Sequence, residues 1–218
     1  MILSLAGPLG LSFDGRVNFF KKWKYAFLSG VLVAIPFVIW DSIFTQNGFW
    51  GFNAERILGH KLFELPVEEI SFFIIVPFCC LFIFELLSFF NYQFPGKFWN
   101  KFSLLIGIGL FCIGIRFSNQ WYTILSFGLG GLSLMVLYFM KAIQWNRFWL
   151  LYLIHLIPFF VVNGFLTVFP VVWYNNAENL GIRIGTIPIE DTSYSLIALL
   201  WNVVLYEIFK RKKSSEKI

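Results

Sequence analysis

The chain contains an internal repeat. Shifted by 122 positions, the sequence aligns with itself without a gap from Trp23 to Glu85, and 14 of these 63 positions carry the same residue. The matches include proline, asparagine, glycine and glutamate, which apolar segments rarely share by chance. A repeat of this kind indicates that similar structural units stand next to each other. We therefore expect a doubled architecture.

The most informative repeated segment places two adjacent acids after a proline. Residues 65–69 (LPVEE) align with residues 187–191 (IPIED), and each copy stands directly before a long apolar segment. Proline suits the first position of a helix, and acidic residues in the first turn interact favourably with the helix dipole. The motif therefore predicts the start of a helix in each copy. Taken alone, it requires no function beyond two stable helix ends.

The apolar content of the chain is typical of a membrane protein. Hydrophobic residues make up 58% of the sequence and charged residues only 13%, which is more apolar surface than a soluble domain can bury. Segment 1–13 is apolar but short for a membrane span. Six clearer spans are expected at about 25–43, 70–90, 102–117, 121–140, 148–169 and 192–209.

These segments predict an all-α polytopic membrane protein with about seven transmembrane helices, built from two parallel tandem repeats. Residues 1–100 are expected to form the first repeat, residues 101–118 a linking helix, and residues 119–218 the second repeat. Four helices separate the start of one repeat from the start of the other, so both cross the membrane in the same direction. Both acidic motifs then open on the same side.

Basic residues predict the orientation of the chain. Four of them flank the motif side: Arg56, Lys61, Arg116 and Arg183. Thirteen flank the other side: Arg16, Lys21, Lys22, Lys24, Lys97, Lys101, Lys141, Arg147, Lys210, Arg211, Lys212, Lys213 and Lys217. Because cytoplasmic loops are enriched in lysine and arginine, we expect a bacterial inner-membrane protein with a cytoplasmic C-terminus and non-cytoplasmic motifs. This distribution accounts for the net charge of +5, and no nucleic-acid partner is expected.

The paired acids suggest proton transfer. Two adjacent carboxyl groups at a dry helix end do not both ionise easily, which favours a carboxylic acid beside a carboxylate; at a helix end exposed to water both ionise instead. An acid, a carboxylate and aromatic faces that stabilise cations suit a carbocation reaction. The candidate catalytic residues are Glu68, Glu69, Glu190 and Asp191.

Residues close to the motifs are candidates for substrate binding. Asp41 and Asn163 occupy equivalent positions near the outer ends of two expected helices. Asn53 and Asn175 are also equivalent, and bracing of the loops is their alternative role. Aromatic side chains near the motifs commonly face lipid or its interface as well. Phe73, Trp50 and Tyr174 are also near the motifs, and the aromatic residues predicted to bind substrate are Phe72, Tyr194, Trp40 and Trp173.

Other polar and small residues are expected to be structural. Glu85 and Glu207 lie one helix length from the motifs and are expected to pair with basic residues such as Lys210. The glycines within residues 128–131 permit close contact between helices. The sequence carries no metal-ligand cluster, phosphate loop or dinucleotide fingerprint, so no metal or cofactor is expected.

In these segments the sequence resembles the small membrane lycopene cyclases. That family occurs as two half-size subunits in some actinobacteria, as one chain in archaea and Bacteroidetes, and joined to phytoene synthase in fungi. The similar segments are residues 65–73 with 76–77, residues 179–191, and residues 40–41, 50–53 and 173–176. The first helix is shorter than is usual in the family.

The resemblance implies a lycopene β-cyclase that closes the linear ψ-ends of lycopene into β-ionone rings, giving γ-carotene and then β-carotene without a flavin. It implies lycopene and γ-carotene as lipid-soluble substrates, in contact with membrane lipid. The family's acids map onto the four motif acids, with Glu68 or Glu190 as proton donor and Glu69 or Asp191 as base.

Two other interpretations stay open at this stage, and so does the oligomeric state. The enzyme could close only one ring or act on another acyclic carotenoid. A transporter or lipid-binding protein is also compatible, because parallel repeats and membrane acids suit ion coupling.

Overall fold

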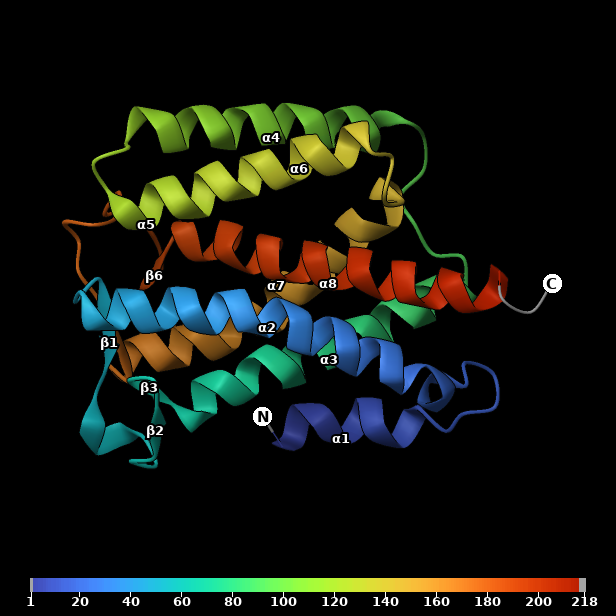
Figure 1. Cartoon of the computed structure of the whole chain (residues 1–218), viewed down its shortest axis with the longest axis horizontal. Helices are drawn as coiled ribbons and strands as arrows, with labels where there is room; N and C mark the ends of the chain where they lie inside the picture. Colours follow the sequence, from blue (N-terminus) through green and yellow to red (C-terminus); the bar gives the residue numbers. More distant parts are fainter. Residues whose placement is uncertain (1, 216–218) are drawn as a thin grey trace.

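Long helices lie alongside one another in the computed structural model, which describes residues 2–215, and short strands gather at one end of the bundle (Figure 1). Lys217, one of the basic residues counted above, lies outside the described residues. The helices are α1 (Ile2–Leu11), α2 (Trp23–Gln46), α3 (Val67–Phe89), α4 (Phe98–Arg116), α5 (Trp121–Thr123), α6 (Leu129–Phe139), α7 (Trp145–Val168) and α8 (Glu190–Ser215). A short helical turn η1 (Phe19–Lys22) precedes α2, and another, η2 (Ala54–Arg56), lies in the loop between α2 and α3. A π-helical turn η3 (Ile124–Gly128) joins α5 to α6.

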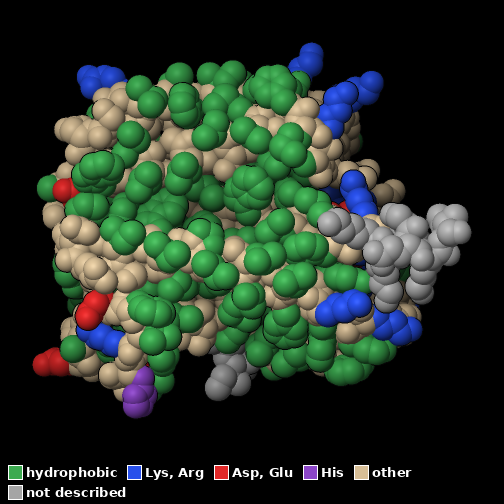
Figure 2. All heavy atoms as spheres, in the orientation of Figure 1, with side chains coloured by type: hydrophobic (Ala, Val, Ile, Leu, Met, Phe, Trp, Pro, Cys, Tyr) green, Lys and Arg blue, Asp and Glu red, His purple; other side chains and the backbone are tan. Residues whose placement is uncertain are grey.

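Six helical segments within residues 2–215 are long and apolar enough to cross a membrane. They are Phe19–Gln46, Val67–Phe89, Phe98–Arg116, Trp121–Phe139, Trp145–Val168 and Glu190–Arg211. Helix α1, at 10 residues, reaches only about 15 Å and is not among them. Hydrophobic side chains cover the visible flank of the bundle, and most charged side chains lie toward its two ends (Figure 2). The all-α polytopic membrane fold is confirmed.

The repeat relates the helices in pairs. The offset of 122 places α2 on α7 and α3 on α8, and both α2 and α7 contain a proline at the equivalent position, Pro36 and Pro158. It places α1 on residues 124–133, within η3 and α6, and gives α4 no counterpart. The domain division at residues 100 and 118 remains a proposal.

The two loops at the motif end cross each other. Strands β1 (Trp50–Phe52) and β4 (Val172–Tyr174) pair antiparallel, with Gly51 opposite Trp173 at the centre. These two residues are equivalent in the repeat, so the crossing lies where a twofold axis relating the repeats is expected. The hydrogen bonds around it are reciprocal: Asn53 N–H donates to the Val171 carbonyl (2.9 Å), and Asn175 N–H donates to the Phe49 carbonyl (2.8 Å).

Each loop then forms the same small hairpin before its helix. Strands β2 (Lys61–Leu62) and β3 (Leu65–Pro66) make the first hairpin, and β5 (Arg183–Ile184) and β6 (Ile187–Pro188) make the second. Both motif prolines therefore end a strand, and placing them at the first helical position was wrong. The helices do begin at the motifs, at Val67 and Glu190.

Ion pairs hold the opposite end of the bundle together. Glu85 on α3 is buried and accepts hydrogen bonds from Lys22 Nζ (2.5 Å), Lys210 Nζ (2.7 Å) and the Tyr206 hydroxyl (2.7 Å). Its repeat counterpart Glu207 pairs with Lys210 at 2.5 Å. The predicted pairing of both glutamates with Lys210 is confirmed.

Close helix contact at the glycines of α6 is also confirmed. A Cβ atom at Gly131 would lie 2.5 Å from the Phe111 backbone nitrogen and would press on the Gly107 carbonyl oxygen of α4. Helices α4 and α6 can therefore touch backbone to backbone only because these positions lack side chains.

Candidate active site

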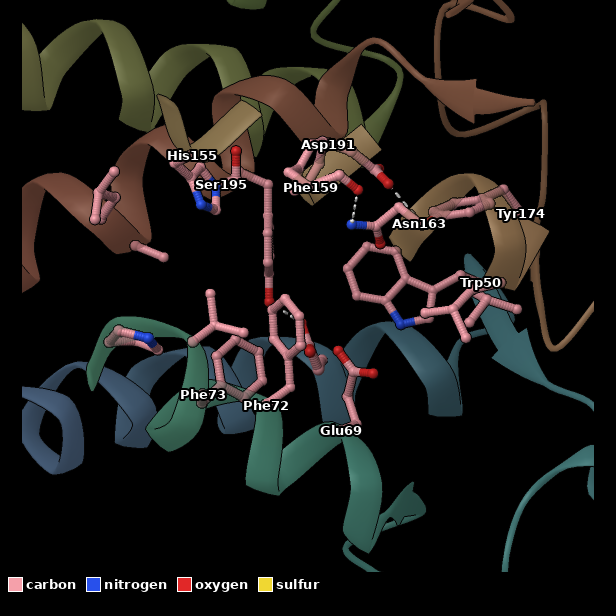
Figure 3. A pocket seen from close by; sticks show the side chains of 18 of the residues that line it. Trp50, Glu69, Phe72, Phe73, His155, Phe159, Asn163, Tyr174, Asp191 and Ser195 are labelled. Atoms are coloured by element: carbon pink, nitrogen blue, oxygen red, sulfur yellow. Dashed lines mark hydrogen bonds between the residues drawn. The ribbon is translucent and has the colours of Figure 1, made fainter. Parts of the chain in front are cut away.

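A cavity lies at the motif end of the bundle, against the crossing of β1 and β4 (Figure 3). Six of the twelve predicted site residues line it: Asp41, Glu69, Phe72, Asn163, Asp191 and Tyr194. The repeat relates these six as three pairs, 41 with 163, 69 with 191, and 72 with 194. The cavity is therefore built from equivalent positions of both repeats.

The second acid of each motif faces this cavity. Glu69 projects from the first turn of α3, and Asp191 projects from the first turn of α8 on the opposite wall (Figure 3). Both helices start here because a hairpin ends immediately before each of them. The repeat thus brings one carboxyl group from each half of the chain to a single space.

Two tyrosines hold Asp191 in place. The Tyr122 hydroxyl donates to Asp191 Oδ1 (2.5 Å), and the Tyr174 hydroxyl donates to Asp191 Oδ2 (2.7 Å). Burial, together with the nearby Asp191 carboxylate, raises the pKa of the Tyr174 hydroxyl well above its usual range. Tyr174 therefore keeps its proton and acts as a donor. A carboxylate that accepts two hydroxyl hydrogen bonds is stabilised in its charged form.

Glu69 has a different environment. No group within residues 2–215 donates a hydrogen bond to its carboxyl group, although it lies in the cavity wall. Its neighbour Asp41 accepts a hydrogen bond from the Tyr194 hydroxyl (2.6 Å). The counterpart of Asp41 is Asn163, which donates to the Phe159 carbonyl (3.0 Å) instead. The two walls of the cavity are related in position but differ in chemistry.

The first acid of each motif is absent from the cavity lining. Glu68 Oε1 accepts the Leu58 backbone N–H (2.7 Å), and Glu190 Oε1 accepts the Leu180 backbone N–H (2.8 Å). Glu190 is fully buried and also accepts from the Thr123 hydroxyl (2.8 Å). The structure therefore separates the four predicted catalytic acids into two that face the cavity and two that face the loops.

The remaining predicted residues lie around the cavity rather than in its lining. Asn53 Oδ1 accepts the Glu55 N–H and Asn175 Oδ1 accepts the Ala177 N–H, both at 3.0 Å, which is the loop-bracing role. Trp40 packs edge-on against the Tyr194 ring, with centroids 5.1 Å apart. Trp173 lies over Gly51 at the strand crossing.

Several lining residues were not predicted as site residues. They include Tyr122 and Tyr174, which hold Asp191. Trp50 packs against the Tyr122 ring, with ring centroids 4.9 Å apart. His155 also lines the cavity, and its Nδ1 atom lies 3.5 Å from Cys80 Sγ. The sequence did point to Tyr174, because Tyr174-Asn175 aligns with Phe52-Asn53 in the repeat. Tyr122 lies outside the aligned repeat, so nothing pointed to it.

The cavity combines groups that suit acid-base chemistry on an apolar molecule. Its walls are aromatic and aliphatic, with Phe72, Phe73 and Phe159 among the lining residues. Ring faces in such a space stabilise positive charge, and carboxyl groups on opposite walls can give and take a proton.

Comparison with known proteins places this geometry in context. The model of the family described as "Lycopene cyclase" matches residues 1–87 and 119–209, and so leaves out the segment that contains α4. No solved structure gives a significant match to the chain.

Curated relatives with this resemblance are fungal proteins named bifunctional lycopene cyclase/phytoene synthase. The protein from Pyrenophora tritici-repentis is 36% identical over 73 residues, which is 32% of this chain and 12% of the relative. That from Leptosphaeria maculans is 32% identical over 66 residues, 30% of this chain and 11% of the relative. That from Arthroderma gypseum is 41% identical over 44 residues, 20% of this chain and 7% of the relative. The matches thus span only about a tenth of the length of these relatives.

Proposed function

Because the chain belongs to the lycopene cyclase family, we propose that it is a membrane enzyme that closes the linear ψ-ends of lycopene into rings. The observation that carries the proposal is the position of Glu69 and Asp191 on opposite walls of one apolar cavity. A polyene end between them meets a proton donor on one side and a proton acceptor on the other.

Each ψ-end is cyclised by the addition of one proton and the loss of another. A proton adds to C2 of the C1=C2 double bond and leaves a cation at C1. The C5=C6 double bond attacks C1, so the C1–C6 bond closes the ring and the charge moves to C5. Loss of the C6 proton to a base then forms the C5=C6 double bond of a β-ring. The product is an isomer of the substrate, since one proton is added and one is removed.

We assign the donor role to Glu69 and the base role to Asp191. Asp191 accepts hydrogen bonds from two tyrosine hydroxyls, which favours a carboxylate at the start of the reaction. Glu69 accepts no hydrogen bond from the described residues. Its charged form therefore lacks the stabilisation that Asp191 receives, which favours a protonated carboxylic acid at Glu69. This assignment replaces the expectation that Glu68 or Glu190 donates the proton.

Aromatic residues are proposed to guide the cation. Phe72 and Tyr194, equivalent in the repeat, lie on the two cavity walls, and Trp50 belongs to the strand that closes the cavity at the loop side. Ring faces stabilise a nearby cation by about 0.5–2 kcal/mol each, and they exclude water that would trap it as an alcohol. The orientation proposed for the chain places this cavity toward the non-cytoplasmic side of a bacterial inner membrane, with the basic end in the cytoplasm.

Expression in cells that accumulate lycopene tests the proposal. Glu69→Gln and Asp191→Asn keep the size of each side chain but remove the titratable group, and we expect cyclic carotenoids to fall by about 100-fold or more. Glu55→Gln is the matched control, because Glu55 is an exposed acid in the loop that precedes α3 and does not line the cavity. Chromatography of the pigments also separates one-ring from two-ring products. Undiminished cyclisation by Glu69→Gln and Asp191→Asn would show that these acids do not transfer the proton.

A further inference from the structure

The first acid of each motif forms the same contact in both halves of the chain. The Glu68 carboxylate accepts the N–H of Leu58 at 2.7 Å, and the Glu190 carboxylate accepts the N–H of Leu180 at 2.8 Å. In both cases the donor lies ten residues before the acid, and the two donors are equivalent under the offset of 122. The repetition of a specific backbone contact indicates a built feature rather than an accident of packing.

The backbone between donor and acceptor also shares two features in the two halves. A glycine with positive φ follows each donor, Gly59 at 84° and Gly181 at 69°. The residue before each acid then donates its N–H back across the hairpin, Val67 to the His60 carbonyl (3.1 Å) and Ile189 to the Ile182 carbonyl (3.0 Å). Each loop is therefore folded back so that its start is tied to the first turn of the following helix.

The loops fastened by these hydrogen bonds also contain the strands that wall the cavity. The loop held by Glu68 contains β1, which contributes Trp50 and Phe52 to the lining. The loop held by Glu190 contains β4, which carries Tyr174, and Tyr174 donates to Asp191. Each first acid thus stands next in sequence to a cavity acid and fixes the loop that covers it.

From these contacts we infer that Glu68 and Glu190 are positioning residues, which fasten the two crossing loops over the cavity as hydrogen-bond acceptors and take no part in proton transfer. The effect on the reaction rests on the proposed function; the fastening of the loops does not. The chemistry needed is an acceptor oxygen at each position, which a glutamine side chain also supplies.

A comparison of glutamine and alanine variants tests the inference. Glu68→Gln and Glu190→Gln retain an acceptor oxygen, whereas Glu68→Ala and Glu190→Ala remove it. We expect the glutamine variants to keep cyclisation within about threefold of the unmodified protein, and the alanine variants to lose about tenfold or more, because the backbone N–H is then left without its side-chain acceptor. A proton-transfer role predicts instead that glutamine is as damaging as alanine, as expected at Glu69.

Hydrogen exchange of the backbone amides provides a readout independent of activity. The amides of Leu58 and Leu180 should exchange about tenfold faster or more in the alanine variant of their own half, with the amide of the other half unchanged. Equal loss of cyclisation in the glutamine and alanine variants would overturn the inference, even if an alanine variant fails to fold. Unchanged exchange at Leu58 and Leu180, or unchanged cyclisation in folded alanine variants, would overturn it as well. If the unmodified protein lacks cyclase activity, the proposed function fails, and the exchange data alone decide whether the loops are fastened.

Discussion

The buried Glu85 carboxylate is expected to contribute much more to stability than its repeat counterpart Glu207. Glu85 is only 3% exposed and receives hydrogen bonds from two lysines and one tyrosine, from η1 and α8. In the Glu85→Gln variant, Lys22 and Lys210 keep their charges but lose the carboxylate between them. Removing one partner of a buried ion pair costs about 3–5 kcal/mol, because the remaining charge is left uncompensated.

The expected loss for Glu85→Gln is at the lower end, about 3 kcal/mol, because the two lysine side chains are 30% and 28% exposed and water can partly solvate them. For a chain of this size, about 2–4 °C of melting temperature corresponds to each kcal/mol, so the midpoint should fall by about 6–12 °C. Glu207→Gln is the matched control. Its side chain is 19% exposed and sits at the end of the bundle, so we expect a loss of about 1 kcal/mol or less.

Thermal unfolding of the purified protein in detergent, followed by circular dichroism, measures both variants. Cyclisation at low temperature should be unchanged in both, because Glu85 and Glu207 lie at the end of the bundle opposite the cavity. A midpoint for Glu85→Gln equal to or above that of Glu207→Gln would refute the reasoning, since it would mean that the buried three-partner site contributes no more than the ion pair of Glu207 at the end of the bundle.

Two further substitutions probe helix contact and the cavity wall. Gly131→Ala should destabilise the protein by about 1–3 kcal/mol, because a Cβ atom at this position would lie 2.5 Å from the Phe111 backbone nitrogen of α4. Gly109→Ala on α4 is the control: its Cβ atom would meet nothing within 4 Å, so it should be neutral in the same unfolding assay. Tyr174→Phe removes one of the two hydroxyl donors to Asp191 and should slow cyclisation about tenfold. Tyr25→Phe is the control, because it removes a hydroxyl that has no hydrogen-bond partner in residues 2–215, and it should leave the rate unchanged. Equal stability of the two glycine variants, or equal rates of the two tyrosine variants, would contradict these contacts.

The repeat made the helices and part of the cavity predictable from the sequence. The apolar segments gave the spans, and the repeated proline and acids marked where α3 and α8 begin. Asp41 and Asn163 were identified as site candidates because they occupy equivalent positions at the right depth, and both line the cavity. These inferences rest on apolar periodicity and on repeat equivalence, and both can be read from the sequence without knowing how the helices pack.

The roles of the individual acids could not be read in the same way. Adjacent residues of a helix point about 100° apart, so one acid of each motif had to face away from the other, but which one faces the cavity depends on how the helix is rotated in the bundle. The contact between Tyr122 and Asp191 joins residues 69 positions apart and lies outside the repeat. Tertiary packing brings them together, with Tyr122 on α5 also held against Phe44 of α2 and Trp50 of β1.

The crossing of β1 and β4 also shows that the cavity needs both halves of the repeat. Each copy lends a strand to the cover of a space that lies between the copies, so neither half alone encloses anything. Identical halves would present the same group twice, whereas here glutamate corresponds to aspartate, aspartate to asparagine, and phenylalanine to tyrosine. The two copies thus share the enclosure while its two walls carry different groups, as the proposed division into proton donor and base requires.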